Sequence, residues 1–536
     1  MTRTIWSLLF ALFLSNAIAL AQESITVQTD KGPVVGRQAG AARTFFGIPY
    51  AAPPVGDLRW KAPQSPAAWT SPHDASAFGN VCFQVAIGML EGEDQTKGKI
   101  LGSEDCLYLN VYSPSSATPN NRLPTMVWIH GGAFIFGAGN EYDASVLAQK
   151  HGVVVVTLNY RLGSIGFLAL PSLEAESSDG ASGNYGLLDQ QAALRWVQSN
   201  IAAFGGDPGN VTLFGESAGA MSVCAQLASL AAAGLFHKAI IQSGPCTSPN
   251  NSGAAADSTK RNLDYADKLG CKNGNLACLR KIDPAKLAAQ VVPGKRPLGN
   301  MVWAPVYGTP LLPLSLRTAF ERGSFNRVPV MNGTNHDEGR FFISLATPDG
   351  KALPLYKYWA ATGLLVGARK SRTVLQQYPY RASGTPALAL TTVLTDFMFS
   401  CPALNVSSDI SKYVPVYAFE FNDPQDITTL KTPPGMDSMG SFHSSGLVYI
   451  FRTPLAGLGA DPAQFSPAQR QLSDAFSEAW ATFAKTGDPN GQSQQRWRKF
   501  EPGRANVQVF APSGISESTD FADDHKCSFW SKLQIN

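Results

Sequence analysis

The pattern of apolar and polar residues predicts a sheet that is buried on both faces. Several short runs are almost continuously apolar, and helical or loop-rich segments separate them. Such strands are typical of mostly parallel sheets, because helices cover both faces and neither face meets water. The apolar runs are residues 125–130, 153–158, 211–214, 238–243, 328–332 and 414–421.

Helical spacing between two of these strands predicts an α/β fold. Residues 189–204 have this spacing and end at the stop signal Gly205-Gly206-Asp207-Pro208. The strand at residues 211–214 follows, and residues 220–230 again have a helical pattern. Strand, helix and strand in this order predict a mostly parallel central sheet with helices on both faces.

The start of the chain has a different pattern. Residues 25–36 alternate between apolar and polar side chains around a turn at Gly32, which predicts a small antiparallel hairpin at the sheet edge. The long Gly/Pro/Ser-rich segments 171–186 and 245–258 are interpreted as loops, because strands recur on both sides without a shift in composition. We therefore expect one domain, residues 22–536.

The first residues resemble a cleavable secretory signal peptide. Arg3 precedes an apolar run at residues 5–14, and Ala19-Leu20-Ala21 supplies a small-residue cleavage site. The run is too short to cross a bilayer comfortably, so residues 1–21 predict export with cleavage after Ala21. The sequence thus predicts a secreted or periplasmic protein without a stable membrane anchor.

Composition excludes some functional classes. The chain has 536 residues, 44% hydrophobic and 15% charged, and a formal net charge of +3, as expected for a globular protein with a large core. This charge is too small to indicate nucleic-acid binding. Eight cysteines in an oxidising compartment indicate disulfides rather than catalysis, and no C-x-x-C pair or histidine cluster accompanies them. We expect no metal and no cofactor.

A pentapeptide between strand and helix identifies a candidate nucleophile. Gly215-Glu216-Ser217-Ala218-Gly219 matches G-x-S-x-G, directly after the strand that ends at Phe214. In α/β-hydrolases this sharp turn presents the serine hydroxyl, and flanking glycines avoid clashes. Ser217 is the predicted nucleophile of an α/β-hydrolase fold.

A second loop supplies candidate donors for an oxyanion. His130-Gly131-Gly132-Ala133-Phe134 follows the strand at residues 125–129 and resembles the HGGG-type loop. Backbone N–H groups must face the oxygen that becomes negative when an ester carbonyl is attacked. We expect Gly132, Ala133 and Ala218 to donate these N–H groups.

Further motifs are spread over nearly the whole chain after residue 21. They are residues 46–51, 54–56, 103–110, 183–190, 204–208 and 214–219, and Trp497. With these segments the chain resembles the type-B carboxylesterase family, which includes the cholinesterases. The resemblance implies hydrolysis of carboxylic esters.

The acid and the base follow the nucleophile in this fold. His443 lies in a loop of small residues after Ser217 and matches the family's base. Glu338 matches the family's Gly-x-x-x-x-Glu-Gly pattern, with Asp337 as its rival for the role of acid. We expect a triad of Ser217, His443 and Glu338.

The resemblance also implies three cysteine pairs. These are Cys82 with Cys106, Cys271 with Cys278, and Cys401 with Cys527. Cys224 and Cys246 form either a fourth bridge or two buried free thiols, and we favour the bridge.

Two positions depart from the family. The loop between Cys82 and Cys106 lacks the tryptophan that holds quaternary ammonium groups in cholinesterases, and Phe83 is its one aromatic residue. Choline esters are therefore disfavoured. Gly446 stands where the family usually has glutamate. Without that carboxylate, we expect the hydrogen-bond network beneath His443 to differ from the family's.

These observations predict a secreted carboxylic ester hydrolase that acts through an acyl-enzyme on a small-molecule or polymer ester. The alternatives are an amidase, a lactonase or a polyester hydrolase on the same site. A catalytically inactive binding or adhesion protein of this fold should lack a triad member, so we disfavour it.

Overall fold

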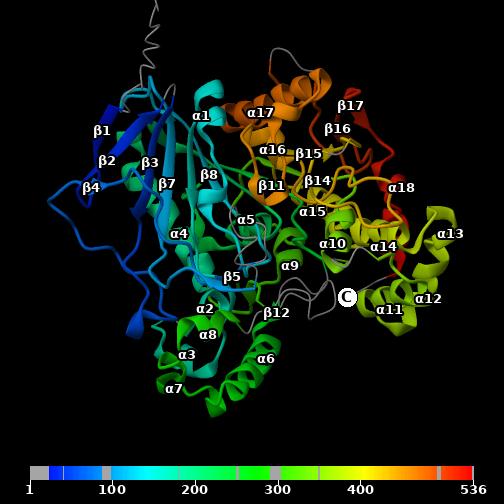
Figure 1. Cartoon of the computed structure of the whole chain (residues 1–536), viewed down its shortest axis with the longest axis horizontal. Coiled ribbons are helices and arrows are strands. Elements are labelled where there is room, and N and C mark those ends of the chain that lie inside the picture. The colour runs from blue at the N-terminus through cyan, green and yellow to red at the C-terminus, as the bar shows by residue number, and fades with distance from the viewer. Residues whose placement is uncertain are drawn as a thin grey trace, which may run out of the picture.

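The computed structural model describes residues 23–39, 42–86, 98–178, 180–248, 253–289, 303–347, 351–425, 427–491 and 496–533. The predicted signal peptide, residues 1–21, lies outside these ranges. Within them, a 13-stranded sheet extends across the molecule (Figure 1). Strands near the start of the chain form one edge, and strands near its end form the other.

The middle of this sheet is parallel and its two ends are antiparallel. Parallel pairing runs from β9 through β8, β10, β11, β14 and β15 to β16, whereas β1, β2, β3, β7 and β9 pair antiparallel, as do β16 and β17. β4 (His73–Asp74) pairs with β2 outside this order. In spatial order the strands are β1 (Glu23–Gln28), β2 (Pro33–Ala39), β3 (Ala42–Pro49), β7 (Tyr108–Pro114), β9 (Val154–Leu158), β8 (Leu123–Ile129), β10 (Gly206–Glu216), β11 (Lys238–Gln242), β14 (Val330–Asn335), β15 (Val416–Phe421), β16 (Val507–Ala511) and β17 (Gly514–Ser518).

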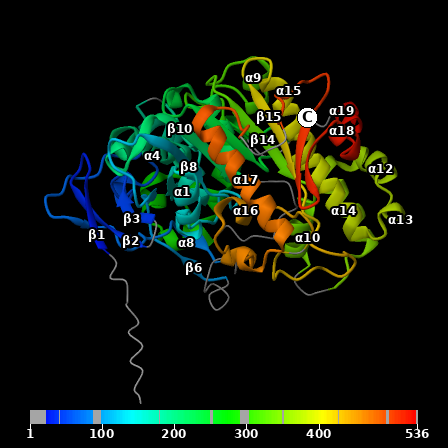
Figure 2. The same ribbon diagram turned by 90° about the horizontal axis from the view of Figure 1, so that it is seen from above.

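Both faces of the parallel strands are buried, as their continuous apolar runs require. Along β8, Met126 and Trp128 belong to one core cluster, and Val127 and Ile129 belong to the cluster on the opposite face. Helices α1 (Ser145–His151), α16 (Leu447–Phe451) and α17 (Pro467–Thr486) cover the first face, and α4 (Tyr185–Asn200), α5 (Ala218–Ala228) and α15 (Cys401–Ile410) cover the second. Figure 2 shows α16 and α17 on one side of the strands and α15 on the other.

Further helices and two small sheets lie around the central sheet. In Figure 1, α6 and α7 lie below the sheet and α11 to α13 lie at its right. The remaining helices are α2 (Gly163–Phe167), α3 (Pro171–Glu176), α6 (Ala255–Lys268), α7 (Leu276–Arg280), α8 (Pro284–Ala289), α9 (Leu316–Glu321), α10 (Gly339–Ala346), α11 (Leu355–Val366), α12 (Ala368–Gln377), α13 (Tyr380–Ser383), α14 (Pro386–Leu394), α18 (Phe521–Asp524) and α19 (Cys527–Leu533). The small sheets pair β5 (Gln84–Val85) with β6 (Ile100–Leu101), and β12 (Gly253–Ala254) with β13 (Val306–Tyr307).

One helical run passes a length and composition test for crossing a membrane. It comprises α14, the π-helix at Thr395–Ser400 and α15, and 83% of its most apolar window is buried inside the protein. Within the described ranges no second run passes. Its burial against the sheet and neighbouring helices explains its apolar composition.

The predicted fold class is confirmed, with differences in detail. The strand predicted at residues 211–214 already begins at Gly206, because an irregularity between Gly206 and Val211 lets it pair with β8 on both sides of Pro208. The antiparallel strands β3, β7, β16 and β17 were not predicted. The predicted hairpin, β1 and β2, forms one edge of the sheet as expected, β3 and β7 join it to the parallel strands, and β16 and β17 form the opposite edge.

Candidate active site

Ser217 lies on a strained turn between β10 and α5. Its backbone angles are φ 56° and ψ −120°, and its N–H donates to the carbonyl of Gln242 at 3.0 Å. A non-glycine residue in such a conformation costs on the order of 1–3 kcal/mol and is held only where the surroundings enforce it. The side chain is neither fully buried nor freely exposed. The turn therefore fixes Ser217 at the carboxyl end of β10, partly open to solvent.

The two glycines of the pentapeptide are required by close backbone contacts. A Cβ on Gly219 would lie 2.0 Å from the carbonyl oxygen of Ile129, and one on Gly215 would lie 2.6 Å from the carbonyl carbon of Gly219. Contacts this short are forbidden by sterics. The tight approach of α5 to the end of β8 is what places Ser217 beside the loop that follows β8.

That loop is built from consecutive residues in left-handed conformations. Gly132, Ala133 and Phe134 have φ values of 95°, 52° and 61°, and a Cβ on Gly132 would lie 2.0 Å from the carbonyl oxygen of Phe136. In the described part of the chain, the N–H groups of Gly132, Ala133 and Ala218 donate to no other residue. Unpaired N–H groups at a half-buried loop are suited to receive an oxyanion.

The loop also lies close to the serine. An ideal Cβ on Gly131 would be 3.2 Å from Cβ of Ser217 and 3.0 Å from Oε2 of Glu216. Gly131 therefore allows the predicted oxyanion loop and the nucleophile turn to touch. A larger side chain there would push them apart.

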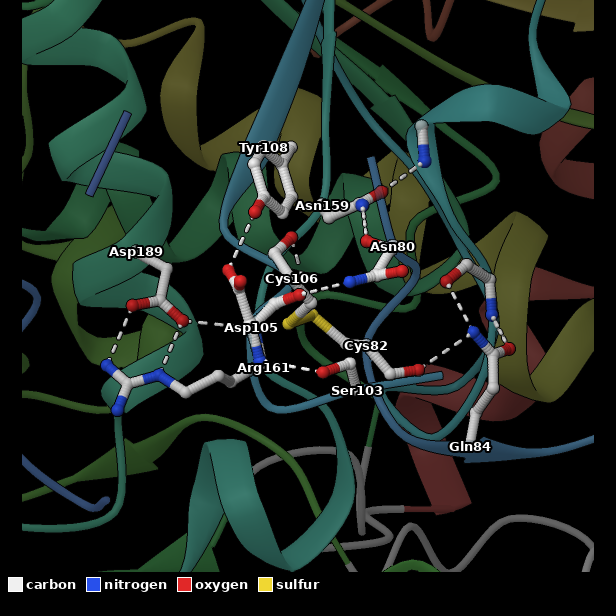
Figure 3. The surroundings of a disulfide bond; sticks show 12 residues. Asn80, Cys82, Gln84, Ser103, Asp105, Cys106, Tyr108, Asn159, Arg161 and Asp189 are labelled. Carbon is white, nitrogen blue, oxygen red and sulfur yellow. Dashed lines mark hydrogen bonds and ion pairs between the residues drawn. A yellow bond between two sulfur atoms is a disulfide. The ribbon is translucent and has the colours of Figure 1, made fainter. Parts of the chain in front are cut away.

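A disulfide-bonded segment supports the far end of this loop (Figure 3). Cys82 is bonded to Cys106, and the side chain of Gln84 lies two residues further along. The amide of Gln84 accepts from the N–H of Gly137 at 2.8 Å and donates to its carbonyl at 3.3 Å. This pair of hydrogen bonds fixes where the loop after β8 ends.

The structure brings His443 and Glu338 together. Nδ1 of His443 lies 2.5 Å from Oε2 of Glu338, and Oε1 of Glu338 accepts from the N–H of Asn335 at 2.8 Å. Glu338 is fully buried. Its rival Asp337 instead forms an ion pair with Arg340 at 3.0 Å. Of the two neighbouring carboxylates, Glu338 is the one that can hold the imidazole.

A second carboxylate faces the other nitrogen of this histidine. Oε1 of Glu216 lies 3.2 Å from Nε2 of His443, and the hydroxyl of Ser444 donates to the same oxygen at 2.6 Å. Among the described residues Nε2 has no hydrogen-bond partner, and the Ser217 hydroxyl does not donate to it in this structure. Nε2 is thus available to accept a proton.

Burial and charge shift the titration of these groups. Burial raises the pKa of Glu216 to about 7, although His443 and Ser444 act against it. Burial lowers the pKa of His443, but Glu216 and Glu338 outweigh it, and the pKa lies above its ordinary value. The carboxylates therefore favour the imidazolium that a general base becomes when it takes a proton.

Three phenylalanines form an apolar wall around the histidine. The ring centroids of Phe341, Phe342 and Phe399 lie 6.0, 5.0 and 4.9 Å from that of His443. Phe341 and Phe342 are on α10, and Phe399 is on the π-helix between α14 and α15. The site is thus apolar beside its ionisable groups.

The departure at Gly446 does not leave the loop beneath His443 without hydrogen bonds. The side chain of Asn335 donates to the carbonyl of Phe442 at 2.7 Å and to the hydroxyl of Ser445 at 3.3 Å. A Cβ on Gly446 would be 3.4 Å from the oxygen of this asparagine, an ordinary contact. Asn335 therefore ties the histidine loop to β14.

All eight cysteines are paired in disulfides, and none is free. Cys224 of α5 is bonded to Cys246 beyond β11, with a sulfur–sulfur distance of 2.07 Å. Of the two alternatives for this pair, the structure forms the bridge. The other bonds are Cys82–Cys106, Cys271–Cys278 and Cys401–Cys527.

Comparison with known proteins finds relatives that match most of the chain. A model of the carboxylesterase family matches residues 23–530. The para-nitrobenzyl esterase of Bacillus subtilis (strain 168) is 39% identical over 478 residues, which cover 87% of this chain and 91% of that protein. The fumonisin B1 esterase of Sphingopyxis macrogoltabida is 35% identical, over 93% of this chain and 89% of that protein.

The fold is also similar to solved structures. That of a thermophilic PNB esterase superposes with a TM-score of 0.78 at 35% identity, and the match covers 94% of this chain and 99% of that chain. Similarity in sequence and in fold therefore extends over nearly the whole chain.

Proposed function

The chain belongs to the carboxylesterase family and is a carboxylic ester hydrolase, and on this premise we propose that it is exported and hydrolyses esters with Ser217, His443 and Glu338. The observation that carries this proposal is the buried 2.5 Å contact between His443 and Glu338. It leaves the second imidazole nitrogen without a hydrogen-bond partner among the described residues, beside Glu216, the residue that directly precedes Ser217.

Acylation begins when Oγ of Ser217 attacks the ester carbonyl carbon. Nε2 of His443 accepts the serine proton, and the electron pair of the C=O bond moves to oxygen. The N–H groups of Gly132, Ala133 and Ala218 donate to this oxyanion. When the carbonyl re-forms, the bond to the alcohol oxygen breaks, and His443 returns its proton to the leaving alcohol.

Deacylation repeats these steps with water as the nucleophile. His443 accepts a proton from water while the hydroxyl oxygen attacks the acyl carbon, and it then gives that proton to Oγ of Ser217 as the acid leaves. Glu338 keeps the proton of the imidazole on Nδ1 and stabilises the cation in both steps. Loss of a single oxyanion donor typically costs about 10²–10³ in rate.

The apolar wall of Phe341, Phe342 and Phe399 favours uncharged acyl or aryl groups. Phe83, the aromatic residue of the loop after Cys82, is half-buried, and the described part of that loop offers no tryptophan for a quaternary ammonium group. The names of two relatives refer to para-nitrobenzyl and fumonisin B1 esters. We therefore place neutral esters ahead of choline esters as substrates.

A panel of substrates separates the proposal from its alternatives. The purified mature protein is given p-nitrophenyl esters of increasing acyl length, butyrylcholine, a p-nitroanilide, a lactone and a polyester film. Because amines leave less readily than alcohols, we expect turnover of aryl and alkyl esters to exceed that of the anilide. If the anilide, the lactone or the film is turned over faster than every simple ester, the protein is an amidase, a lactonase or a polyester hydrolase instead.

Export is supported by the disulfides as well as by the N-terminal sequence. The structure has four disulfides. In most mesophilic cells disulfides persist only in an oxidising compartment, such as the periplasm or the medium. Cleavage after Ala21 would release residues 22–536 as one domain. N-terminal sequencing of the protein from the periplasm or medium should give Gln22 first, and recovery of an uncleaved chain in the cytosol would contradict export.

A further inference from the structure

A cluster of two histidines and a glutamate lies outside the proposed catalytic site. His336 follows β14, Glu420 is on β15, and His525 lies between α18 and α19. Oε1 of Glu420 is 3.0 Å from Nδ1 of His336 and 2.9 Å from Nε2 of His525. One ligand atom from each of the three residues lies within 4.8 Å of the others.

These separations fit cis positions around one metal ion. Ligand atoms about 2.0–2.1 Å from a metal lie roughly 2.9–3.4 Å from each other in octahedral and tetrahedral sites. Two imidazoles and one carboxylate are a donor set that divalent zinc, iron, cobalt and nickel accept. The three side chains therefore have the chemistry of a metal site, and the two separations from Glu420 have its spacing.

A fourth residue orients one of the ligands. Oδ1 of Asp396, on the π-helix before α15, lies 2.7 Å from Nδ1 of His525. The other carboxylate oxygen accepts from the hydroxyl of Tyr378 at 2.8 Å, and the indole of Trp530 donates to that hydroxyl at 2.7 Å. A carboxylate behind a ligating histidine keeps the proton on Nδ1 and leaves the Nε2 lone pair for the metal.

The charge of the cluster also suits a cation. Asp396 and Glu420 are both buried, and the described charged groups within ion-pair distance of them are His525 and His336, while Lys526 attracts Asp396 from further away. Two buried carboxylates need positive charge to offset their desolvation. Without a metal, His525 must donate from both nitrogens and therefore be an imidazolium.

We propose that His336, Glu420 and His525 bind one divalent transition metal of the zinc class, with Asp396 orienting His525. The side chain of His336 is 38% exposed, whereas those of Glu420 and His525 are 8% and 5% exposed. The site thus opens to solvent on the side of His336, where water completes the coordination. The proposal is independent of the esterase mechanism.

Sequence patterns give no indication of this metal site, because its ligands are far apart in the chain. His336 and Glu420 are 84 residues apart, and Glu420 and His525 are 105 apart, so no local pattern reveals them. The sheet brings β14 and β15 side by side, and the Cys401–Cys527 disulfide holds the segment of His525 near the helix that carries Asp396. A metal here would join three distant segments and stabilise the fold.

Metal binding is tested on the full mature chain with its disulfides intact and without a polyhistidine tag. The protein is freed of metal by dialysis against a chelator and titrated with Zn²⁺ by calorimetry and with Co²⁺ by visible absorption. We expect one ion per chain, a ligand-field band of cobalt, and a rise in Tm of at least about 2 °C at a hundredfold excess of Zn²⁺ over Kd.

Three variants and a control identify the ligands. His336→Asn and Glu420→Gln should abolish the cobalt band and weaken zinc binding by at least about 10-fold, and Asp396→Asn should weaken it by about 10- to 100-fold. His73→Asn, which removes another half-buried histidine, should leave binding unchanged.

The His336→Asn variant separates loss of metal binding from loss of folding. The side chain of His336 is partly exposed, so its replacement leaves the core intact. Equal zinc affinity in this variant and the wild type would overturn the proposal. So would a wild-type protein that gives no cobalt band and no calorimetric binding. The cluster would then be a set of ion pairs around a protonated His525.

Discussion

The carboxylate of Glu216 provides a quantitative test of the proposed general base. Its Oε1 lies 3.2 Å from Nε2 of His443, and its pKa is about 7. Two unit charges at this separation attract by about 5 kcal/mol at an effective dielectric constant of about 20. This value is an upper bound, because Glu216 is only partly ionised near neutral pH.

Glu216→Gln should therefore lower the pKa of His443 by roughly 1 to 2 pH units. Since the base must be neutral to accept a proton, the acid limb of the rate profile should move to lower pH by the same amount. The plateau should fall by up to about 10-fold, because a weaker base removes the serine proton less effectively. The amide of Gln can still accept from Ser444, so the local packing is retained.

The assay is kcat/KM for a p-nitrophenyl ester between about pH 5 and 9, which reports the free enzyme's ionisations. Absorbance is read at the isosbestic point of p-nitrophenol, so that product ionisation does not distort the profile. Glu501→Gln, on the exposed surface, serves as the control and should leave the limb unchanged. An acid limb that stays in place or moves to higher pH in Glu216→Gln would refute the electrostatic argument.

Four further variants test the site and its supports. Glu338→Gln should lower kcat by on the order of 10⁴, whereas Asp337→Asn should retain most of the activity. If steady-state kinetics showed the larger loss in Asp337→Asn, Asp337 would be the acid. Replacing both Cys224 and Cys246 by Ser should lower the free energy of unfolding by about 3 kcal/mol, given their separation of 22 residues, and an unchanged Tm would contradict a stabilising bridge. Gly219→Ala places a Cβ 2.0 Å from a carbonyl oxygen of β8, so soluble expression and activity should both fall, and a fully active variant would show that the turn can relax.

The nucleophile turn could be predicted from sequence because every part of it is local. Gly215 and Gly219 flank the serine, an apolar strand precedes it and a helix follows it. The structure adds the reason for the second glycine, which is the carbonyl oxygen of Ile129 on a strand far away in the chain. The G-x-S-x-G spacing indicates that the backbone is tightly packed at Gly219, but it does not identify Ile129 as the neighbouring residue.

The choice between Glu338 and Asp337 depended on family resemblance, because adjacent carboxylates look alike in sequence. In the structure their side chains diverge: Glu338 contacts the histidine, and Asp337 pairs with Arg340. The i,i+3 spacing of Asp337 and Arg340 was a signal that sequence reasoning could have used.

Contacts between distant segments were beyond what sequence patterns could provide. Whether Cys224 and Cys246 pair depends on how α5 packs against the end of β11, and periodicity does not determine that geometry. The cluster around Glu420 likewise exists only because β15 lies beside β14 and the C-terminal segment returns to both.

Covalent labelling of the serine tests the central claim most directly. The mature protein is inactivated with diethyl p-nitrophenyl phosphate, which phosphorylates activated serines, and the adduct is located by peptide mapping and mass spectrometry. The account predicts a single diethylphosphoryl group on Ser217, formed in step with loss of esterase activity and absent from Ser217→Ala. A fully inactivated protein whose adduct lies on another residue, or a Ser217→Ala variant with wild-type turnover, would contradict it.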